Sequence, residues 1–441
     1  MQPISPIRVS ANGRYFVDPH GKPVFWLGDT QWELFRQCTT DQALRILRNR
    51  QAKGFNVILI MLTGVDHGAF DPNRPAPYTN LDGELPWVDG DPLRPNEAYF
   101  RRVDDMIRLG EQTGQTFVVG VYHQWHAGII TLDKARAWAR WVAQRYRGAP
   151  NLIWSMYPRA EPGYMPVCRE LAAGLQEGDG GAHLISMHPD PSVASSSFMH
   201  GEEWLAFNMI QTCVEYDRIF EAVTADYRRA PARPVIMAEG GYEGVEFGKL
   251  QTAHHIRQQA YWTQLAGGHH VYGHNDAWQA PQSFEAWIDA PGSQHLRIFK
   301  DIITSQEGWW DLIPDQTIFA AGAGSGYALN VSARSADGRW AIAYLSEPST
   351  VALRFEPIAP AGRMVASWVN PTSGDRMSAG NHEAHGAASF TCPSGWEDAV
   401  LLVRPAEASE PARQDAWDQV WGLLRRKVVD VDREIEEMRG R

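Results

Sequence analysis

The chain has 441 residues, of which 44% are hydrophobic and 21% are charged, and its formal net charge is −11. These values are ordinary for a globular enzyme, and the length favours one large domain with a smaller one beside it. An acidic balance without a basic stripe argues against a nucleic-acid partner.

The cysteines and the start of the chain exclude further classes. Cys38, Cys168, Cys213 and Cys392 are far apart and form no CxxC pair, so we expect neither a zinc ribbon nor a disulfide framework. Residues 1–10 contain no apolar signal core, and no run approaches transmembrane length, so we expect no membrane partner. The sequence as written predicts a cytoplasmic protein, or a secreted or periplasmic one if a signal peptide has been removed.

Eight short apolar runs with helical patterns between them organise most of the chain. They lie at 24–29, 55–62, 117–122, 151–156, 184–187, 207–211, 234–239 and 269–274. Most of their starts are about thirty residues apart, the size of one βα unit, and the runs are continuous, as in strands covered on both faces. We therefore predict a (β/α)8 TIM barrel over residues 1–312. An open doubly wound sheet is the alternative, but no glycine-rich phosphate loop follows an early strand.

The longest interval between predicted strands is the segment 64–96. It is rich in proline, contains Tyr78 and Trp87, and shows no helical or strand periodicity. A loop of this length in a compact domain is usually functional or disordered. On a barrel it would lie over the catalytic end, so we interpret it as a wall of the pocket.

The pattern changes after Trp309 and Trp310. Short strands separated by Gly, Pro, Ser and Asp follow, which predicts a small antiparallel β-sandwich over residues 313–406. In the tail, 407–441, apolar residues recur at alternating intervals of four and three. This amphipathic helix either assembles a homo-oligomer as a coiled coil or docks on its own barrel.

Nearly every predicted barrel strand ends in a side chain that can titrate or donate and accept hydrogen bonds. Taken singly, each is explained by a helix cap or a salt bridge. In a TIM barrel, however, the carboxyl ends of all strands meet at one end, which is where ligands bind. These strand-end residues are Asp29, Asp66, His123, Arg159, Glu161, His188, Gln211, Glu239, His274 and Asp276.

The composition of this set narrows the chemistry. It combines carboxylates and imidazoles with nearby aromatic residues, among them Trp32, Tyr242 and Trp278. No serine lies in a nucleophile-elbow sequence, and we expect neither a metal nor a cofactor. Paired carboxylates between aromatic walls are what glycoside hydrolysis requires, because one acid protonates the leaving oxygen and the other attacks or activates water.

A set of short motifs, in order along the barrel, strengthens this interpretation. They are Gly28-Asp-Thr30, Trp32-Glu-Leu-Phe35, Lys53-Gly-Phe55, Arg94-Pro-Asn-Glu-Ala-Tyr-Phe100, Asn151-Leu-Ile-Trp154, Phe207-Asn-Met-Ile-Gln211, Glu239 with Tyr242-Glu243, Tyr272-Gly-His274 and Trp278-Gln279, and Trp368-Val-Asn-Pro-Thr-Ser-Gly374 follows in the sandwich. With them the chain resembles the apiosidase-like glycoside hydrolases, glycoside hydrolase family 140. The resemblance implies a barrel with a small β-domain that acts on glycosides, and it places the nucleophile at Glu239.

One departure from the family pattern concerns the general acid. Family members usually continue the Asn-Ile-Ile-Trp strand with Gly-Gly-Asp-Arg, whose Asp is taken as the acid/base. Counted from Trp154, that place is held by Arg159, which stays charged and cannot act as a general acid. Three alternatives follow: Glu161 takes the role of acid/base, another carboxylate (Asp66 or Asp276) takes it, or the protein binds a sugar without cleaving it.

We favour Glu161 and predict a glycosidase, retaining in mechanism, with Glu239 as nucleophile and Glu161 as acid/base. The expected substrate is an oligosaccharide or glycoside from a plant or microbial glycan, with a pentofuranoside-type or related sugar. The alternative is a carbohydrate-binding pseudoenzyme in which Arg159 clamps an acidic sugar. The predicted substrate-binding residues are Asp29, Trp32, Asp66, His123, Arg159, His188, Gln211, Tyr242, His274, Asp276 and Trp278.

Overall fold

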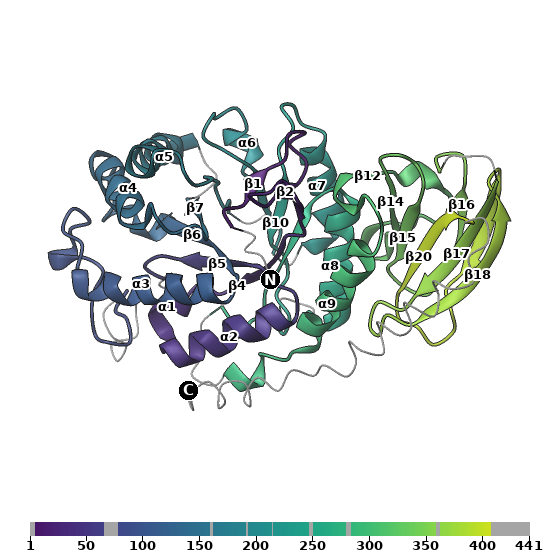
Figure 1. Ribbon diagram of the computed structural model, residues 1–441, viewed down its shortest axis with the longest axis horizontal. Coiled ribbons are helices and arrows are strands. Elements are labelled where there is room, and N and C mark those ends of the chain that lie inside the picture. Colours follow the sequence, from purple (N-terminus) through teal and green to yellow (C-terminus); the bar gives the residue numbers. More distant parts are fainter. Residues whose placement is uncertain are drawn as a thin grey trace.

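The computed structural model describes residues 5–65, 78–158, 162–190, 193–213, 215–246, 250–278, 284–358 and 362–406. Asp66, Arg159 and Glu161 lie outside the described residues, and so does the predicted tail helix at 407–441. The described chain forms a barrel with a β-sandwich beside it (Figure 1).

The barrel sheet confirms the predicted TIM-barrel architecture. Its strand order is β7-β6-β5-β4-β11-β10-β9-β8, with parallel pairing throughout except at β8. The predicted strand at 184–187 is reduced to Ile185, which bridges Trp154 on one side and Leu205 on the other and so closes the sheet. The strands are β4 (Leu27–Thr30), β5 (Val57–Met61), β6 (Thr116–His123), β7 (Leu152–Tyr157), β8 (Val193–Ala194), β9 (Asn208–Gln211), β10 (Val235–Glu239) and β11 (His269–Tyr272).

Helices cover the outside of the barrel, and their starts follow from local chemistry. A reciprocal capping box between Thr39 and Gln42 begins α2, and the Asn96 side chain caps α3. Among the described residues, no helix has both the length and the apolar character needed to cross a membrane. The helices are α1 (Leu34–Gln37), α2 (Thr40–Ala52), α3 (Glu97–Gln112), α4 (Leu132–Tyr146), α5 (Met165–Asp179), α6 (Ser196–Met199), α7 (Ile219–Tyr227), α8 (Ala253–Leu265) and α9 (Pro291–Thr304).

Short 3₁₀ turns connect several of these elements. They are η1 (Val88–Gly90), η2 (Gln124–His126), η3 (Pro162–Tyr164), η4 (Tyr216–Arg218), η5 (Phe284–Ala286), η6 (Trp309–Asp311), η7 (Gln316–Ile318) and η8 (Gly326–Ala328). The described part of the long loop packs against η2, where the Tyr78 ring lies 4.9 Å from the ring of His126. Since η2 directly follows β6, this part of the loop lies at the carboxyl-terminal end of the barrel.

The opposite end of the barrel is closed by a small antiparallel sheet that the sequence pattern did not predict. It consists of β1 (Arg8–Val9), β2 (Phe16–Val17) and β3 (Pro23–Val24). Phe16 is fully buried, 4.6 Å from the Trp26 ring and 5.4 Å from the Phe207 ring. These rings belong to the apolar cluster that fills the barrel interior. The interior is therefore solid core, and a ligand can enter only at the carboxyl-terminal end.

The second domain confirms the predicted β-sandwich. A six-stranded sheet of order β12-β14-β15-β20-β17-β18 faces a three-stranded sheet of order β13-β16-β19, and a separate apolar cluster fills the space between them. The strands are β12 (Leu312–Pro314), β13 (Phe319–Ala321), β14 (Val331–Ser335), β15 (Ala341–Leu345), β16 (Thr350–Arg354), β17 (Arg363–Val369), β18 (Arg376–Glu383), β19 (Ala387–Thr391) and β20 (Ala399–Pro405).

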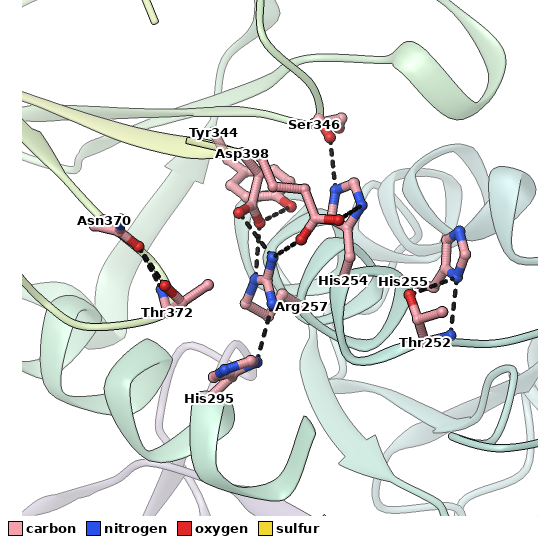
Figure 2. Close-up of polar contacts among 11 residues, drawn as sticks. Thr252, His254, His255, Arg257, His295, Tyr344, Ser346, Asn370, Thr372 and Asp398 are labelled. Carbon is pink, nitrogen blue, oxygen red and sulfur yellow. Dashed lines mark hydrogen bonds and ion pairs between the residues drawn. The ribbon is translucent and has the colours of Figure 1, made fainter. Parts of the chain in front are cut away.

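Helix α8 joins the two domains (Figure 1). Its Arg257 side chain donates two hydrogen bonds to Asp398, of 2.9 and 2.8 Å, and one of 2.9 Å to Glu397 (Figure 2). One helical turn on, the Tyr261 ring stacks on Tyr344 with centroids 4.4 Å apart. Apolar residues of α8, α9 and the six-stranded sheet share one buried cluster. The domains are thus packed as one body.

Candidate active site

Glu239 ends β10, as predicted, and an irregularity in the sheet determines where its side chain points. Ile236 and Ala238 belong to the barrel interior, whereas Val235 and Met237 pack outward against the helices. Strict alternation would also send Glu239 outward. The pairing with β9 shifts register between Met237 and Glu239, and such a bulge re-aims the side chain that follows it. Glu239 therefore faces the residues at the ends of β7 and β9.

Two side chains at or just after the ends of barrel strands, those of Tyr157 and His188, lie against the Glu239 carboxylate. Its Oε2 atom lies 3.2 Å from the Tyr157 hydroxyl and 3.5 Å from His188 Nε2. The rings of Tyr157 and His188 are 4.2 Å apart, and Trp32 packs edge-on against His188 at 5.4 Å. Strand ends that are distant in the sequence thus meet around one carboxylate.

The hydrogen-bond donors around Oε2 are largely committed elsewhere. The single proton of the Tyr157 hydroxyl has a nearer acceptor in Gln211 Oε1, at 2.8 Å. His188 Nδ1 lies 3.0 Å from the carbonyl of Pro189; because a carbonyl can only accept, Nδ1 carries the proton and the neutral ring turns a lone pair at Nε2 toward Glu239. A proton on Glu239 can be donated to one of these neighbours, and the lone pair of His188 Nε2 is the acceptor without another partner in the described structure, so this arrangement favours the carboxylic acid.

The pKa values of Glu239 and His188 agree with this assignment of protons. Burial raises the pKa of Glu239 from its ordinary 4.5 to about 7, against the opposing effect of hydrogen bonds from Tyr242 and Tyr157. Burial also lowers the pKa of His188 to about 4, so this imidazole is neutral at neutral pH. Glu239 is therefore poised to gain or lose a proton near pH 7, as a catalytic carboxyl group must.

Tyr242 is the donor that Glu239 retains. The Trp32 indole nitrogen donates to the Tyr242 hydroxyl over 3.2 Å, which leaves the hydroxyl proton for Glu239. The ring lies directly over Gly273, where an added Cβ would come within 2.2 Å of it. Gly273 is thus required so that the Tyr242 ring can lie at the end of β11.

The loop after β9 carries residues that the sequence analysis missed. Gln211 donates to Cys213 Sγ over 3.2 Å, and Cys213 has a left-handed backbone with φ of 47°, which is uncommon for a residue with a side chain. Burial, together with the charges of Glu239, Asp190 and Glu215, raises the pKa of this thiol to about 12, against the lowering effect of the hydrogen bond from Gln211. Asp190, two residues after His188, is consequently a second carboxylate near this end of the barrel.

Aromatic residues form a wall on the β6 side. His123, at the end of β6, lies edge-on to Tyr157 with centroids 4.8 Å apart, and its other neighbour is Trp125 at 4.9 Å. Trp125 is 42% exposed. This exposed indole, connected to Glu239 through His123 and Tyr157, offers a flat apolar face on which a sugar ring can stack.

Asp29 was predicted to bind the sugar, but its side chain lies inside the protein and contacts other residues. Its side chain is fully buried and bonded to the equally buried Arg50 through Nε at 2.7 Å, and it also accepts a hydrogen bond of 2.8 Å from Gln31. The guanidinium is boxed by the rings of Phe55, Tyr272 and Trp287. With no exposed surface, Asp29 acts as an internal partner that fixes α2 to β4.

The remaining predicted residues follow β11. His274 is partly buried, its Nδ1 accepts from the backbone of Asp276 over 3.1 Å, and burial lowers its pKa. Asp276 is exposed, and Trp278 packs on the apolar cluster of the barrel interior. In the described residues, no three His, Cys, Asp or Glu side chains gather closely enough to hold a metal ion.

Two hollows differ in their relation to this site. A narrow cavity of about 10 Å³ lies beneath Tyr157 and His188, lined also by Trp32, Met61 and Met209. A much larger groove, of about 680 Å³, runs between α4 and α5 on the outside and is lined by Arg136, Arg140 and Arg169 with acidic neighbours. The larger groove contains none of the strand-end residues, so the chemistry belongs with the smaller one.

Solved structures with the same fold define the class. One described as a glycoside hydrolase superposes with a TM-score of 0.81 at 23% identity, covering 91% of this chain and 97% of its own. A glycoside hydrolase family 5 protein from Bacteroides vulgatus also gives 0.81 at 23% identity, covering 92% of this chain and 95% of its own. The chain therefore has a fold that is found in glycoside hydrolases.

The particular family follows from the sequence. Residues 10–311 match the family described as "Apiosidase-like, catalytic domain", and the chain belongs to it. This confirms the resemblance and the prediction of a glycosidase. Residues 313–404 match a family described as "Putative collagen-binding domain of a collagenase". A search of curated proteins gave no match.

Proposed function

We propose that this glycosidase is retaining, with Glu239 as nucleophile and Glu161 as acid/base, and that it releases a pentofuranoside-type or related sugar from a plant or microbial glycan. The observation that carries the proposal is the buried carboxyl group of Glu239, aimed inward by the bulge in β10 and held among the ends of β7 and β9.

In the first step, the ionised Glu239 attacks the anomeric carbon while the acid/base gives its proton to the leaving oxygen. In the second step, the same acid/base takes a proton from water, whose oxygen displaces Glu239. The hydroxyls of Tyr242 and Tyr157 lie where they can donate to the ionised carboxylate. They must release it as the covalent bond forms, so these donors orient the nucleophile.

The surroundings of Glu239 also bear on the sugar. Its described neighbours are tyrosine, tryptophan, glutamine and a neutral histidine, which suit the hydroxyl groups and apolar face of an uncharged ring.

The first prediction concerns hydrolysis itself. We expect the protein to release nitrophenol from at least one member of a panel of nitrophenyl furanosides and pyranosides, and Glu239→Gln to lower kcat by roughly a thousandfold or more. For the wild type, kcat/KM should rise with pH through about 7 as Glu239 ionises.

Two variants assign the acid/base. With an activated nitrophenyl leaving group, an acid/base variant keeps the first step but loses the second, and added azide should restore turnover. We expect this for Glu161→Ala and not for Asp190→Ala. Rescue of Asp190→Ala alone would reassign the role to Asp190. If the protein binds the sugar panel yet releases nothing, hydrolysis is excluded for those sugars and the protein is a binder of them.

A further inference from the structure

Glu239 begins a five-residue segment, 239–243, whose backbone is held at three places. The Glu239 carbonyl accepts hydrogen bonds of 2.9 and 3.2 Å from the amides of Thr212 and Cys213. At the far end, the Glu243 amide donates to the carbonyl of Gly273 over 2.9 Å. The Glu243 carboxylate accepts from the Gly292 amide at the start of α9. Between these anchors lie Gly240 and Gly241.

The middle of this segment is held by one side chain. Gln259 of α8 accepts from the Gly241 amide over 2.9 Å and donates to the Gly241 carbonyl over 3.2 Å. The side-chain amide thus pairs with a backbone unit as a neighbouring strand would. Gln259 is fully buried, and its oxygen comes so close that a Cβ at Gly240 would lie 2.1 Å away. Gln259 and the two glycines therefore fit each other.

The other face of α8 is fixed by the sandwich. Arg257, two residues from Gln259, holds Asp398, and His254 Nε2 lies 2.8 Å from the carbonyl of Ser346 (Figure 2). Trp262 donates to the carbonyl of Leu329 over 3.0 Å. Helix α8 therefore connects sandwich residues on one face to the backbone after Glu239 on the other.

We propose that Gln259 is a positioning residue for the catalytic carboxyl group, and that the sandwich stabilises the active site through α8. The inference rests on the proposed role of Glu239. Gly241 is the residue before Tyr242, whose hydroxyl bonds to Glu239 and lowers its pKa. Releasing Gly241 loosens the Tyr242 ring, so the consequence reaches the carboxyl group itself.

The test compares two buried glutamines of the same helix. Gln259→Met removes both bonds to Gly241 while keeping similar volume. Gln264→Met is the matched control, because Gln264 is also buried on α8 and its side-chain oxygen has no hydrogen-bond partner in the described structure. Both variants are made in the full chain, and their melting temperatures are measured first.

The primary readout needs no substrate. The titration of Glu239 is followed by NMR with carboxyl-labelled glutamate, assigned by comparison with Glu239→Gln. We expect the midpoint to move to higher pH in Gln259→Met, since the bond from Tyr242 that lowers it is weakened, and to stay in place in Gln264→Met. On a substrate that the wild type cleaves, kcat should fall about tenfold or more with little change in KM.

Two outcomes would overturn the proposal. The first is that Gln259→Met and Gln264→Met lower the melting temperature by the same amount and the titration midpoint of Glu239 does not move in Gln259→Met. The other applies even if Gln259→Met does not fold: in the wild type, the Gly241 amide should be as protected from hydrogen exchange as the amides of α8, and fast exchange there would contradict the bond. Absence of hydrolysis in the wild type would count against the proposed function and leave the titration result intact.

Discussion

At the residue scale, the main feature of the site is that neutral side chains surround the carboxyl group of Glu239. Glu239 has no cationic partner among its described contacts; tyrosine hydroxyls and a neutral imidazole surround it. Burial without a counter-charge favours the protonated form. In the proposed mechanism the same residue must ionise to act as a nucleophile, so the surroundings of Glu239 oppose the charge that this mechanism requires.

This conflict predicts an unusual pH dependence of stability. A pKa raised from 4.5 to about 7 means that the folded protein binds the proton more tightly than the unfolded chain. The resulting stability is fully present below pH 4.5 and is lost as the pH rises through 7, and it amounts to about 3 kcal/mol. Glu239→Gln cannot titrate, so its free energy of unfolding should exceed that of the wild type increasingly between pH 5 and pH 8. Urea unfolding at both pH values measures the difference, and equal differences at the two values would contradict the raised pKa.

The strand-end pattern could predict Glu239, His188 and Gln211, because a polar residue after a buried strand must lie where the strands end. It could not predict that Asp29 is withdrawn from solvent, since the partner, Arg50, lies in a helix face that reads as solvated in the sequence. Nor could it predict Tyr157 and Asp190. Tyr157 is an aromatic residue in an apolar run, and only the folded barrel shows that its hydroxyl reaches Gln211.

At the scale of elements, the pairing of β4 with α2 depends on a buried ion pair. Asp29 and Arg50 are both fully buried, and Arg50 also donates to the carbonyl of Ile288 over 2.7 Å. The pair therefore joins the first barrel strand, the first long helix and the segment before α9. Such pairs specify an arrangement more than they stabilise it, because each charge is costly without the other.

Removing one member should reveal that cost. Arg50→Met leaves the Asp29 carboxylate buried with Gln31 as its remaining partner, and we expect a loss of about 3–5 kcal/mol in the free energy of unfolding. In Asp29→Asn/Arg50→Met no charge is buried, so much of that loss should be recovered. Denaturant unfolding of the two variants tests this. A double variant no more stable than Arg50→Met would show that the guanidinium acts mainly through its packing against the aromatic rings.

The sequence patterns predicted some strands of this protein and missed others. Continuous apolar runs predicted the barrel strands because burial on both faces leaves no alternation to misread. The small sheet of β1, β2 and β3 was missed because its strands are two residues each, too short for any periodicity. The bulge in β10 could not be predicted for a different reason. It is a property of the pairing with β9, and the sequence of β10 alone does not determine that pairing.

At the scale of the whole molecule, the sandwich is an integral part of the enzyme. Its Asp398 is 1% exposed and is shared between Arg257 of the barrel and the Tyr344 hydroxyl at 2.7 Å. The sequence predicted the sandwich, but it could not identify its contact with the barrel, since Arg257 and Asp398 lie far apart in the chain. The predicted oligomer through the tail concerns residues outside the described chain and stays a prediction.

A domain interface of this kind predicts joint unfolding. We expect calorimetry of the wild type to show one transition for barrel and sandwich together. Asp398→Asn leaves the buried guanidinium without its main partner and should lower the free energy of unfolding by about 3 kcal/mol. Glu397→Gln is the control: Glu397 binds the same arginine but its side chain is 60% exposed, so the expected loss is below about 1 kcal/mol. Two separate transitions in the wild type would contradict this.

The glycine beneath Tyr242 has a consequence for the history of such a site. A Cβ at position 273 would lie 2.2 Å from the Tyr242 ring, so the ring and any larger residue at 273 are mutually exclusive. A lineage could acquire the tyrosine only after position 273 had become glycine, and it could not later lose that glycine while keeping the ring. A glycine at position 273 is therefore a precondition for the Tyr242 ring, and so for its hydroxyl donor to Glu239.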